Sequence, residues 1–149
     1  MRQAVRAIVI KDNQLLVMRR NKFGQEFCSL VGGGIDVGES RETALYREVA
    51  EEASLQIANP RLVIVEDAGS MFGMQYIYVC DYVGGEPSLA VDSPEALIHA
   101  GGQNLYTPQW LPLTELAATQ LLPSELKALL VQYCPDAWPL EPIELTVAD

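Results

Sequence analysis

The sequence predicts an α/β fold in which a mixed central β-sheet carries helices on its faces. Short apolar runs rich in Val and Ile recur between turn residues, which is typical of strands. The segment 41–53 instead repeats its apolar residues at helical spacing. Strands and helices interleave without the regular alternation of a parallel barrel, which favours a mixed sheet. The length of 149 residues predicts one domain over 1–149, with a Pro-rich tail over 134–149.

The individual elements follow from local patterns. Two apolar runs, 4–10 and 15–18, flank a turn at Asp12 and Asn13 and predict a β-hairpin. Ser40 is a good N-cap for the helix over 41–53. The other predicted elements are, in chain order, a polar loop over 21–26, a strand over 27–31, strands over 61–66 and 74–82, a long loop over 91–104, a strand over 105–111, a helix from Pro123 to about Tyr133 and an extended tail.

Charge is distributed unevenly along the chain. The net charge of −10 argues against nonspecific binding to duplex or other long nucleic acid, which needs clustered Lys and Arg. The first 61 residues hold nine of the ten basic residues, so an anionic substrate is expected to be bound there. The candidate substrate-binding residues are Arg19, Arg20 and Lys22, with Phe23 beside them to stack on a nucleobase.

The three cysteines and the apolar runs indicate the compartment. Cys28, Cys80 and Cys134 are far apart and odd in number, which fits neither a disulfide framework nor a zinc site. No apolar run approaches the roughly 20 residues that cross a bilayer, and the N-terminus lacks the pattern of a signal peptide. The sequence therefore predicts a cytoplasmic protein that does not contact membranes.

The helix over 41–53 carries three glutamates close together. At 100° per residue, Glu48, Glu51 and Glu52 fall within an arc of about 100° beside the apolar stripe. Like charges at this spacing repel by roughly 0.2–0.5 kcal/mol per pair, so a solvated acidic face is one interpretation. A divalent-cation site is the other, because Mg²⁺ prefers carboxylate oxygens.

A glycine-rich turn precedes this helix in a specific pattern. Gly33 is followed after five residues by Glu39 and, after seven more, by Arg47-Glu48-Val49-Ala50-Glu51-Glu52-Ala53-Ser54-Leu55. The pattern from Gly33 to Leu55 resembles the Nudix box of the Nudix hydrolase family, and every fixed position matches except a final glycine, here Ser54. Serine reaches the left-handed conformation of such a glycine at about 1–2 kcal/mol, so the departure concerns how the helix ends. The broader resemblance covers about 4–130.

The resemblance implies both a fold and a reaction. The fold is a Nudix-type α/β/α sandwich, and the reaction is metal-dependent cleavage of the diphosphate bond in a nucleoside diphosphate linked to another moiety. Mg²⁺, or Mn²⁺ in its place, would neutralise the phosphates and lower the pKa of a water molecule. The metal ligands implied are Glu48, Glu51 and Glu52, joined by the backbone carbonyl of Gly33.

The same resemblance implies roles beyond metal binding. Arg47 and Glu39 are expected to pair and hold the glycine-rich loop against the helix. Glu51 or Glu52 is expected to deprotonate the attacking water. Some members of the family take this base from a late loop, where Glu95 is the candidate here; its other interpretation is a residue that starts a helix.

Other functions are weighed against this one. A non-catalytic Nudix-fold sensor of nucleotides is the alternative, although such modules usually lose box glutamates and none is lost here. A metal-dependent isomerase would need more histidines than the single His99. The absence of Lys after the glycines excludes a P-loop, and Val37 breaks the dinucleotide-binding fingerprint. The substrate itself, among nucleoside triphosphates, ADP-ribose, nucleotide sugars and capped RNA, is left open, as is a homodimer in which the tail crosses a partner subunit.

Overall fold

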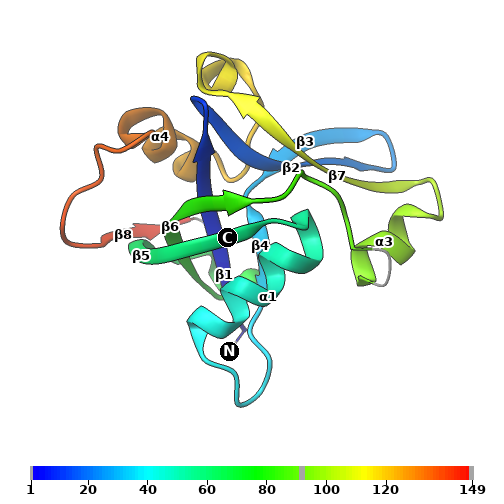
Figure 1. Cartoon of the computed structure of the whole chain (residues 1–149), viewed down its shortest axis with the longest axis horizontal. Helices are drawn as coiled ribbons and strands as arrows, with labels where there is room; N and C mark the ends of the chain where they lie inside the picture. The colour runs from blue at the N-terminus through cyan, green and yellow to red at the C-terminus, as the bar shows by residue number, and fades with distance from the viewer. Residues whose placement is uncertain (1, 91–92, 148–149) are drawn as a thin grey trace.

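The computed structural model describes residues 2–90 and 93–147, and it shows a mixed β-sheet held between helices (Figure 1). This is the predicted α/β/α sandwich. The elements in chain order are β1 (Gln3–Lys11), β2 (Gln14–Lys22), β3 (Gln25–Ser29), β4 (Val31–Gly34), α1 (Arg41–Ala53), β5 (Gln56–Asp67), α2 (Gly69–Phe72), β6 (Met74–Gly84), α3 (Pro94–His99), β7 (Asn104–Pro112), a 3₁₀ helix η1 (Leu113–Ala118), α4 (Ser124–Tyr133) and β8 (Ile143–Thr146).

Strand β1 organises the sheet. It pairs in parallel with β6, and antiparallel with β4 along its first half and with β2 at its end. The strand order is β3-β2-β1-β6-β5-β8, and β7 pairs with β2 on the side away from β3. Because β4 and β2 share one edge of β1, the sheet divides between them. Strand β4, which leads through a loop into α1, lies at this division.

Each face of the sheet has its own apolar core. Helix α1 covers one face with Leu45 and Val49, which cluster with Val9 of β1. Helix α4 covers the other face through Leu130, which clusters with Ile8. Successive residues of a strand point to opposite faces, so β1 serves both cores. Full burial of a Leu or Val stabilises the fold by about 1.5–3 kcal/mol, and this burial fixes α1 on the sheet.

Helix α1 begins and ends where the sequence predicts. The Ser40 hydroxyl accepts a hydrogen bond from the Thr43 amide at 3.1 Å, which caps the first turn. The helix ends at Ala53, and Ser54 adopts the left-handed conformation at φ 58° and ψ 30°. The Ser54 hydroxyl also donates a 2.7 Å hydrogen bond to the Ser88 carbonyl. Serine therefore replaces the family glycine and gains a contact that glycine lacks.

The prediction of a long loop over 91–104 is wrong, because helix α3 lies within it. The Ser93 hydroxyl caps the Ala96 amide at 3.1 Å, and the proline that follows Ser93 suits the first helical turn. His99 ends this helix, and its Nδ1 accepts a hydrogen bond from the Tyr106 amide at 3.0 Å. Residues 91 and 92 of the predicted loop lie outside the described residues.

The strand predictions are corrected at three places. The predicted polar loop over 21–26 is a short turn, because β2 and β3 extend into it. The predicted strand over 27–31 is two strands, because Leu30 separates β3 from β4. Strand β5 begins before the predicted position 61, because a shift of register between Ala58 and Arg61 accommodates the proline between them.

The Pro-rich tail belongs to the fold, which corrects the prediction of a merely extended segment. Strand β8 pairs in parallel with β5. Trp138 is buried at 6% exposure, and its ring lies 5.2 Å from that of Tyr133 in α4. The final helix also begins one residue later than predicted, since Pro123 is its N-cap. The tail thus completes the core beneath α4.

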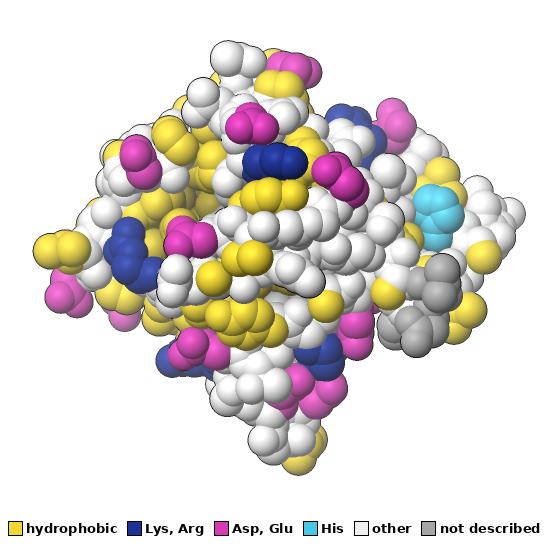
Figure 2. All heavy atoms as spheres, in the orientation of Figure 1, with side chains coloured by type: hydrophobic (Ala, Val, Ile, Leu, Met, Phe, Trp, Pro, Cys, Tyr) yellow, Lys and Arg dark blue, Asp and Glu magenta, His cyan; other side chains and the backbone are white. Residues whose placement is uncertain are grey.

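The surface agrees with the acidic composition. Figure 2 shows one face on which hydrophobic side chains gather between α4 and the β5–β6 strands, with acidic side chains spread around them. Within the described part of the chain, no helix is long and apolar enough to span a membrane.

The left-handed conformation at Ser54 gives a test of how α1 ends. Ser54→Gly removes about 1–2 kcal/mol of backbone strain but also loses a hydrogen bond of about 0.5–1.5 kcal/mol. We expect its free energy of unfolding in urea to stay within about 1 kcal/mol of wild type. Ser54→Val, which keeps the strain and adds β-branching, is expected to lose about 2 kcal/mol or more. Equal stability of all three proteins would contradict the left-handed end.

Candidate active site

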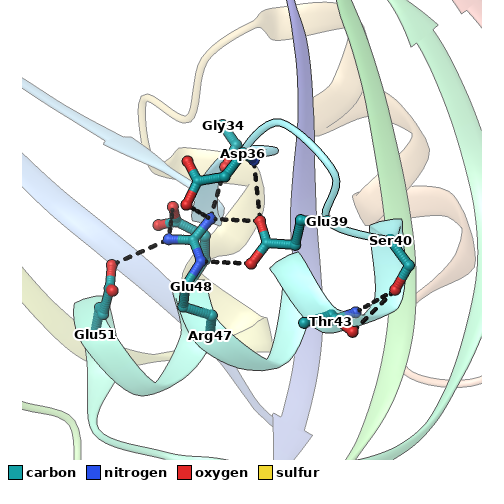
Figure 3. A network of polar contacts seen from close by, with 8 residues as sticks. All are labelled: Gly34, Asp36, Glu39, Ser40, Thr43, Arg47, Glu48 and Glu51. Carbon is teal, nitrogen blue, oxygen red and sulfur yellow. Dashed lines mark hydrogen bonds and ion pairs between the residues drawn. The ribbon is translucent and has the colours of Figure 1, made fainter.

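Arg47 of α1 joins the helix to the glycine-rich loop. Its Nε and Nη2 donate to the two carboxylate oxygens of Glu39 at 2.8 and 2.9 Å. Nη2 also donates to the Gly34 carbonyl at 2.9 Å, while Nη1 donates to Glu48 at 2.8 Å and to Glu51 at 3.3 Å. Figure 3 shows the guanidinium between the loop and the α1 carboxylates. The expected pair of Arg47 with Glu39 is therefore present, and it is bidentate.

The charges in this network reinforce one another. The hydrogen bonds from Arg47, with one from the Asp36 amide, lower the pKa of Glu39 to about 2. The Glu39 hydrogen bond in turn raises the pKa of Arg47. Both groups are therefore ionised across the neutral pH range, so their ion pair ties the loop to the helix.

Glu48 and Glu52 are the buried carboxylates of α1, each 7% exposed. The Gly32 amide donates to Glu52 Oε2 at 3.1 Å. A Cβ on Gly33 would lie only 2.5 Å from Glu48 Oε2, so only glycine lets the backbone approach this carboxylate. Burial raises the pKa of Glu48 and raises that of Glu52 to about 8. Both carboxyl groups therefore face β4 at the division of the sheet.

Glu95, the candidate base from the later part of the chain, interacts with the buried carboxyl groups of α1. Its charge contributes to the raised pKa of both Glu48 and Glu52, after the larger effect of burial. Its Oε1 is buried without a hydrogen-bond partner among the described residues. Helix α3 thus brings a fourth carboxyl group toward the α1 glutamates. Glu95 also lies in the first turn of α3, which agrees with its second predicted role as a residue that starts a helix.

The carboxylates have the chemistry of a hard-cation site. Glu48, Glu52 and Glu95 supply only oxygen donors, and their mutual repulsion favours a positive charge between them. In the described residues no three acidic, His or Cys side chains are gathered at metal-ligand spacing. The Glu51 carboxylate instead contacts Arg47 Nη1 at 3.3 Å. The oxygen donors fit the chemistry that Mg²⁺ prefers.

A cavity of about 850 Å³ is lined by residues of β1, β2, β5, β6 and the start of α4, and two of the four predicted substrate-binding residues are among them. These are Arg20 and Lys22. Glu48, Glu51 and Glu52 do not line it. The Arg20 guanidinium lies 3.7 Å from the ring centroid of Tyr106 and donates to Asn104 at 2.6 Å. Arg19 and Phe23 do not line the cavity, because Arg19 alternates with Arg20 along β2 and Phe23 is 68% exposed in the β2–β3 turn.

The lining residues that the sequence analysis did not single out include three polar ones: Arg6 of β1, Glu66 of β5 and Gln75 of β6. Arg6 Nε donates to Gln75 Oε1 at 3.2 Å, and burial lowers the pKa of Arg6 against the attraction of Glu52. Arg6 therefore connects the cavity with the carboxylates. The sequence signal that could have found Arg6 was a charged residue inside an apolar strand. Such a residue is almost never fully buried unless it is paired, so it indicates a polar partner.

The raised pKa of Glu52 predicts a pH-dependent stability of the metal-free protein. Because this pKa is about 8 against 4.5 for the ordinary group, the folded protein holds a proton that the unfolded chain has lost between these values. The free energy of unfolding should therefore fall as pH rises from about 5 to 8, on the order of 3 kcal/mol for this group. Urea titrations in EDTA at several pH values measure it.

Glu52→Gln is the control for this pH dependence. Because the variant cannot ionise at this position, its advantage over wild type should grow with pH across the same window. A constant difference between the two proteins from pH 5 to 8 would show that Glu52 is ionised throughout.

Comparison with known proteins agrees with this geometry. A curated relative, the ADP-ribose pyrophosphatase of Methanocaldococcus jannaschii, is 31% identical over 100 residues, covering 62% of this chain and 58% of that protein. The NAD-capped RNA hydrolase NudC of Edwardsiella ictaluri is 29% identical over 76 residues, covering 51% of this chain and 30% of NudC. The chain thus spans only about a third of the length of the NudC proteins that it matches.

Solved structures show the same fold. An ADP-ribose pyrophosphatase from Streptococcus suis superposes with a TM-score of 0.66 at 19% identity, covering 98% of both chains. A MutT NUDIX hydrolase from Burkholderia pseudomallei gives a TM-score of 0.60 at 21% identity, covering 76% of this chain and 84% of the other. The family model of the NUDIX domain matches residues 1–131, which include the whole of the Gly33–Leu55 pattern. The chain therefore belongs to the NUDIX domain family.

Proposed function

We propose that the chain is a metal-dependent pyrophosphohydrolase, formed by one domain over 1–149. Its substrate is a nucleoside diphosphate linked to another moiety, as in a nucleoside triphosphate, ADP-ribose or a nucleotide sugar. The observation that carries the proposal is the intact carboxylate set of α1 beside the close backbone approach at Gly33. Relatives named ADP-ribose pyrophosphatase, RNA pyrophosphohydrolase and NAD-capped RNA hydrolase support hydrolysis as the reaction.

The residues divide into ligands and positioning groups. Glu48, Glu51 and Glu52, with the Gly33 carbonyl, would hold Mg²⁺ or Mn²⁺. The bound ion supplies charge neutralisation at the phosphates and a lowered pKa for water. Arg47 acts through the others, because it fixes the loop and one oxygen of Glu48.

The general base is one of three glutamates, and their surroundings differ. Glu51 is bound to Arg47, and Glu52 accepts a hydrogen bond from the Gly32 amide. Glu95 has a buried oxygen with no partner in the described chain. A base must accept a proton at an oxygen that is free to receive it, so the contacts favour Glu95 as the base and Glu52 as a ligand.

The three cysteines support a reducing, cytoplasmic setting for this reaction. All three are free, and burial raises the pKa of Cys80 and of Cys134 to about 12. Thiols with such pKa values stay protonated and unreactive, so we assign them to packing. The proposed substrate in this setting is a small nucleotide.

A hydrolysis panel tests the proposal. Wild type is incubated with Mg²⁺ or Mn²⁺ and with nucleoside triphosphates, ADP-ribose, nucleotide sugars and dinucleoside polyphosphates. We expect metal-dependent cleavage of at least one class. Glu52→Gln should lower turnover about 10²–10⁴-fold, because it removes either a metal ligand or the base.

Glu95→Gln is the second variant in this test. Glu95→Gln should lower turnover comparably if Glu95 is the base, and it should weaken Mn²⁺ binding less than Glu52→Gln does. Activity of Glu52→Gln within a factor of two of wild type would contradict its role. Nucleotide binding without cleavage of any substrate would favour a non-catalytic sensor.

A further inference from the structure

Helix α3 carries the candidate base Glu95, yet it presents its large apolar side chains to solvent. Leu97 is 70% exposed and Ile98 is 45% exposed. The helix is six residues long, and a helix shorter than about 12 residues is marginal without tertiary contacts. Because burial of an apolar stripe does not fix α3 on the sheet, the polar contacts at its two ends carry its position.

The start of α3 is bound to the end of α1. The Ala90 amide donates to the Glu51 carbonyl at 2.9 Å, in the last turn of α1, where carbonyls lack helical partners. The Ser93 hydroxyl donates to the Ala90 carbonyl at 2.8 Å and accepts from the Ala96 amide at 3.1 Å. One bound end leaves a short helix free to pivot, so the direction of α3 depends on its other end.

His99 binds this other end of α3 to the sheet. Its Nδ1 accepts the hydrogen bond from the Tyr106 amide at 3.0 Å, and Figure 1 shows α3 beside the start of β7. Strand β7 pairs with β2 alone among the described strands, so this amide lies on an edge that no other strand there covers. The chain continues through Gly101 and Gly102, which restrain the backbone least. The imidazole is therefore the side-chain contact that holds this end of α3.

The position of α3 determines where the Glu95 carboxyl group lies. Its charge acts on both Glu48 and Glu52, so the three groups repel one another when they are ionised, and this repulsion pushes α3 away from α1. Glu95 Oε1 is buried without a hydrogen-bond partner among the described residues, so no contact at this oxygen resists the repulsion. Glu95 therefore depends on the anchoring of its helix.

We propose that His99 is a positioning residue that anchors α3 to the free edge of β7 and so holds Glu95 against the carboxyl groups of α1. The effect on turnover rests on the proposed function, because it assumes that Glu95 is the base. A ring nitrogen that accepts a hydrogen bond carries no proton, so the neutral ring is protonated at Nε2. Asparagine carries an oxygen acceptor at the δ1 position, whereas leucine carries a methyl group there. His99→Asn thus keeps the anchor, and His99→Leu removes it.

Amide exchange measured by NMR tests the anchor without turnover. The Tyr106 amide should be protected in wild type and in His99→Asn, and it should exchange about threefold faster or more in His99→Leu, the fold-change that one hydrogen bond is worth. The Cys28 amide, bound to the Gln120 carbonyl at 2.8 Å, is the internal reference and should exchange equally in all three proteins. Equal protection of Tyr106 in all three would overturn the anchor.

The imidazole itself gives a second readout. His99 is the one histidine of the sequence, so its ring ¹⁵N signals are unambiguous. In the neutral ring they should show the proton at Nε2 and an acceptor at Nδ1. A proton at Nδ1 would overturn the proposal, because that nitrogen could not accept from the Tyr106 amide.

Kinetics test whether the anchor acts through Glu95. His99→Leu should lower kcat about threefold or more while KM stays within about twofold, and His99→Asn should restore kcat. In the Glu95→Gln background His99→Leu should lower kcat no further, because a positioning residue acts only through the group that it positions. A further loss of the same size in the double variant would overturn the role of His99.

The outcomes for the anchor and for catalysis are independent. No hydrolysis of any substrate, together with Tyr106 protection that follows the acceptor at position 99, would support the anchor and reject the proposed function. Hydrolysis by wild type with an equal kcat in His99→Leu would leave the proposed function intact and reject the positioning role of His99.

Discussion

The guanidinium of Arg47 is the constraint on which the active site depends. It reaches the loop at Gly34 and Glu39 and the helix at Glu48, so one side chain sets the distance between β4 and α1. Lysine could not replace it, because a single ammonium lacks the planar fork that satisfies Glu39 at both oxygens. Once Arg47 is satisfied, Glu52 and Glu95 have no ion pair among the described residues, so their ionisation would leave surplus negative charge at the site. We propose that a divalent cation balances that surplus.

The position of the site follows from the topology of the sheet. Strand β1 carries β4 and β2 on the same edge, and the sheet divides between them. The carboxylates of α1 face β4, and the cavity lies on the face of the sheet that α4 covers. Arg6, on β1 itself, interacts with both.

Patterned and local features were predictable from the sequence, and contacts between distant segments were not. Helix α1 and its end at Ser54 follow from spacing and capping residues, and the pairing of Arg47 with Glu39 followed from the family pattern. Helix α3 was anticipated only through the second interpretation of Glu95, as a residue that starts a helix, although Ser93 and the next residue carry a normal helix start. Arg6 and Glu66 were missed for another reason: a charged residue in an apolar strand has meaning only when the neighbouring strands are known.

Mn²⁺ binding measured by electron paramagnetic resonance tests most directly whether the surplus negative charge belongs to a divalent cation. Wild type should bind Mn²⁺, and Glu48→Gln and Glu52→Gln should each bind it about tenfold more weakly or worse. Glu42→Gln, an exposed glutamate in the first turn of the same helix, is the matched control and should equal wild type. The same Mn²⁺ affinity in all four proteins would contradict the account, because the ion would then bind elsewhere.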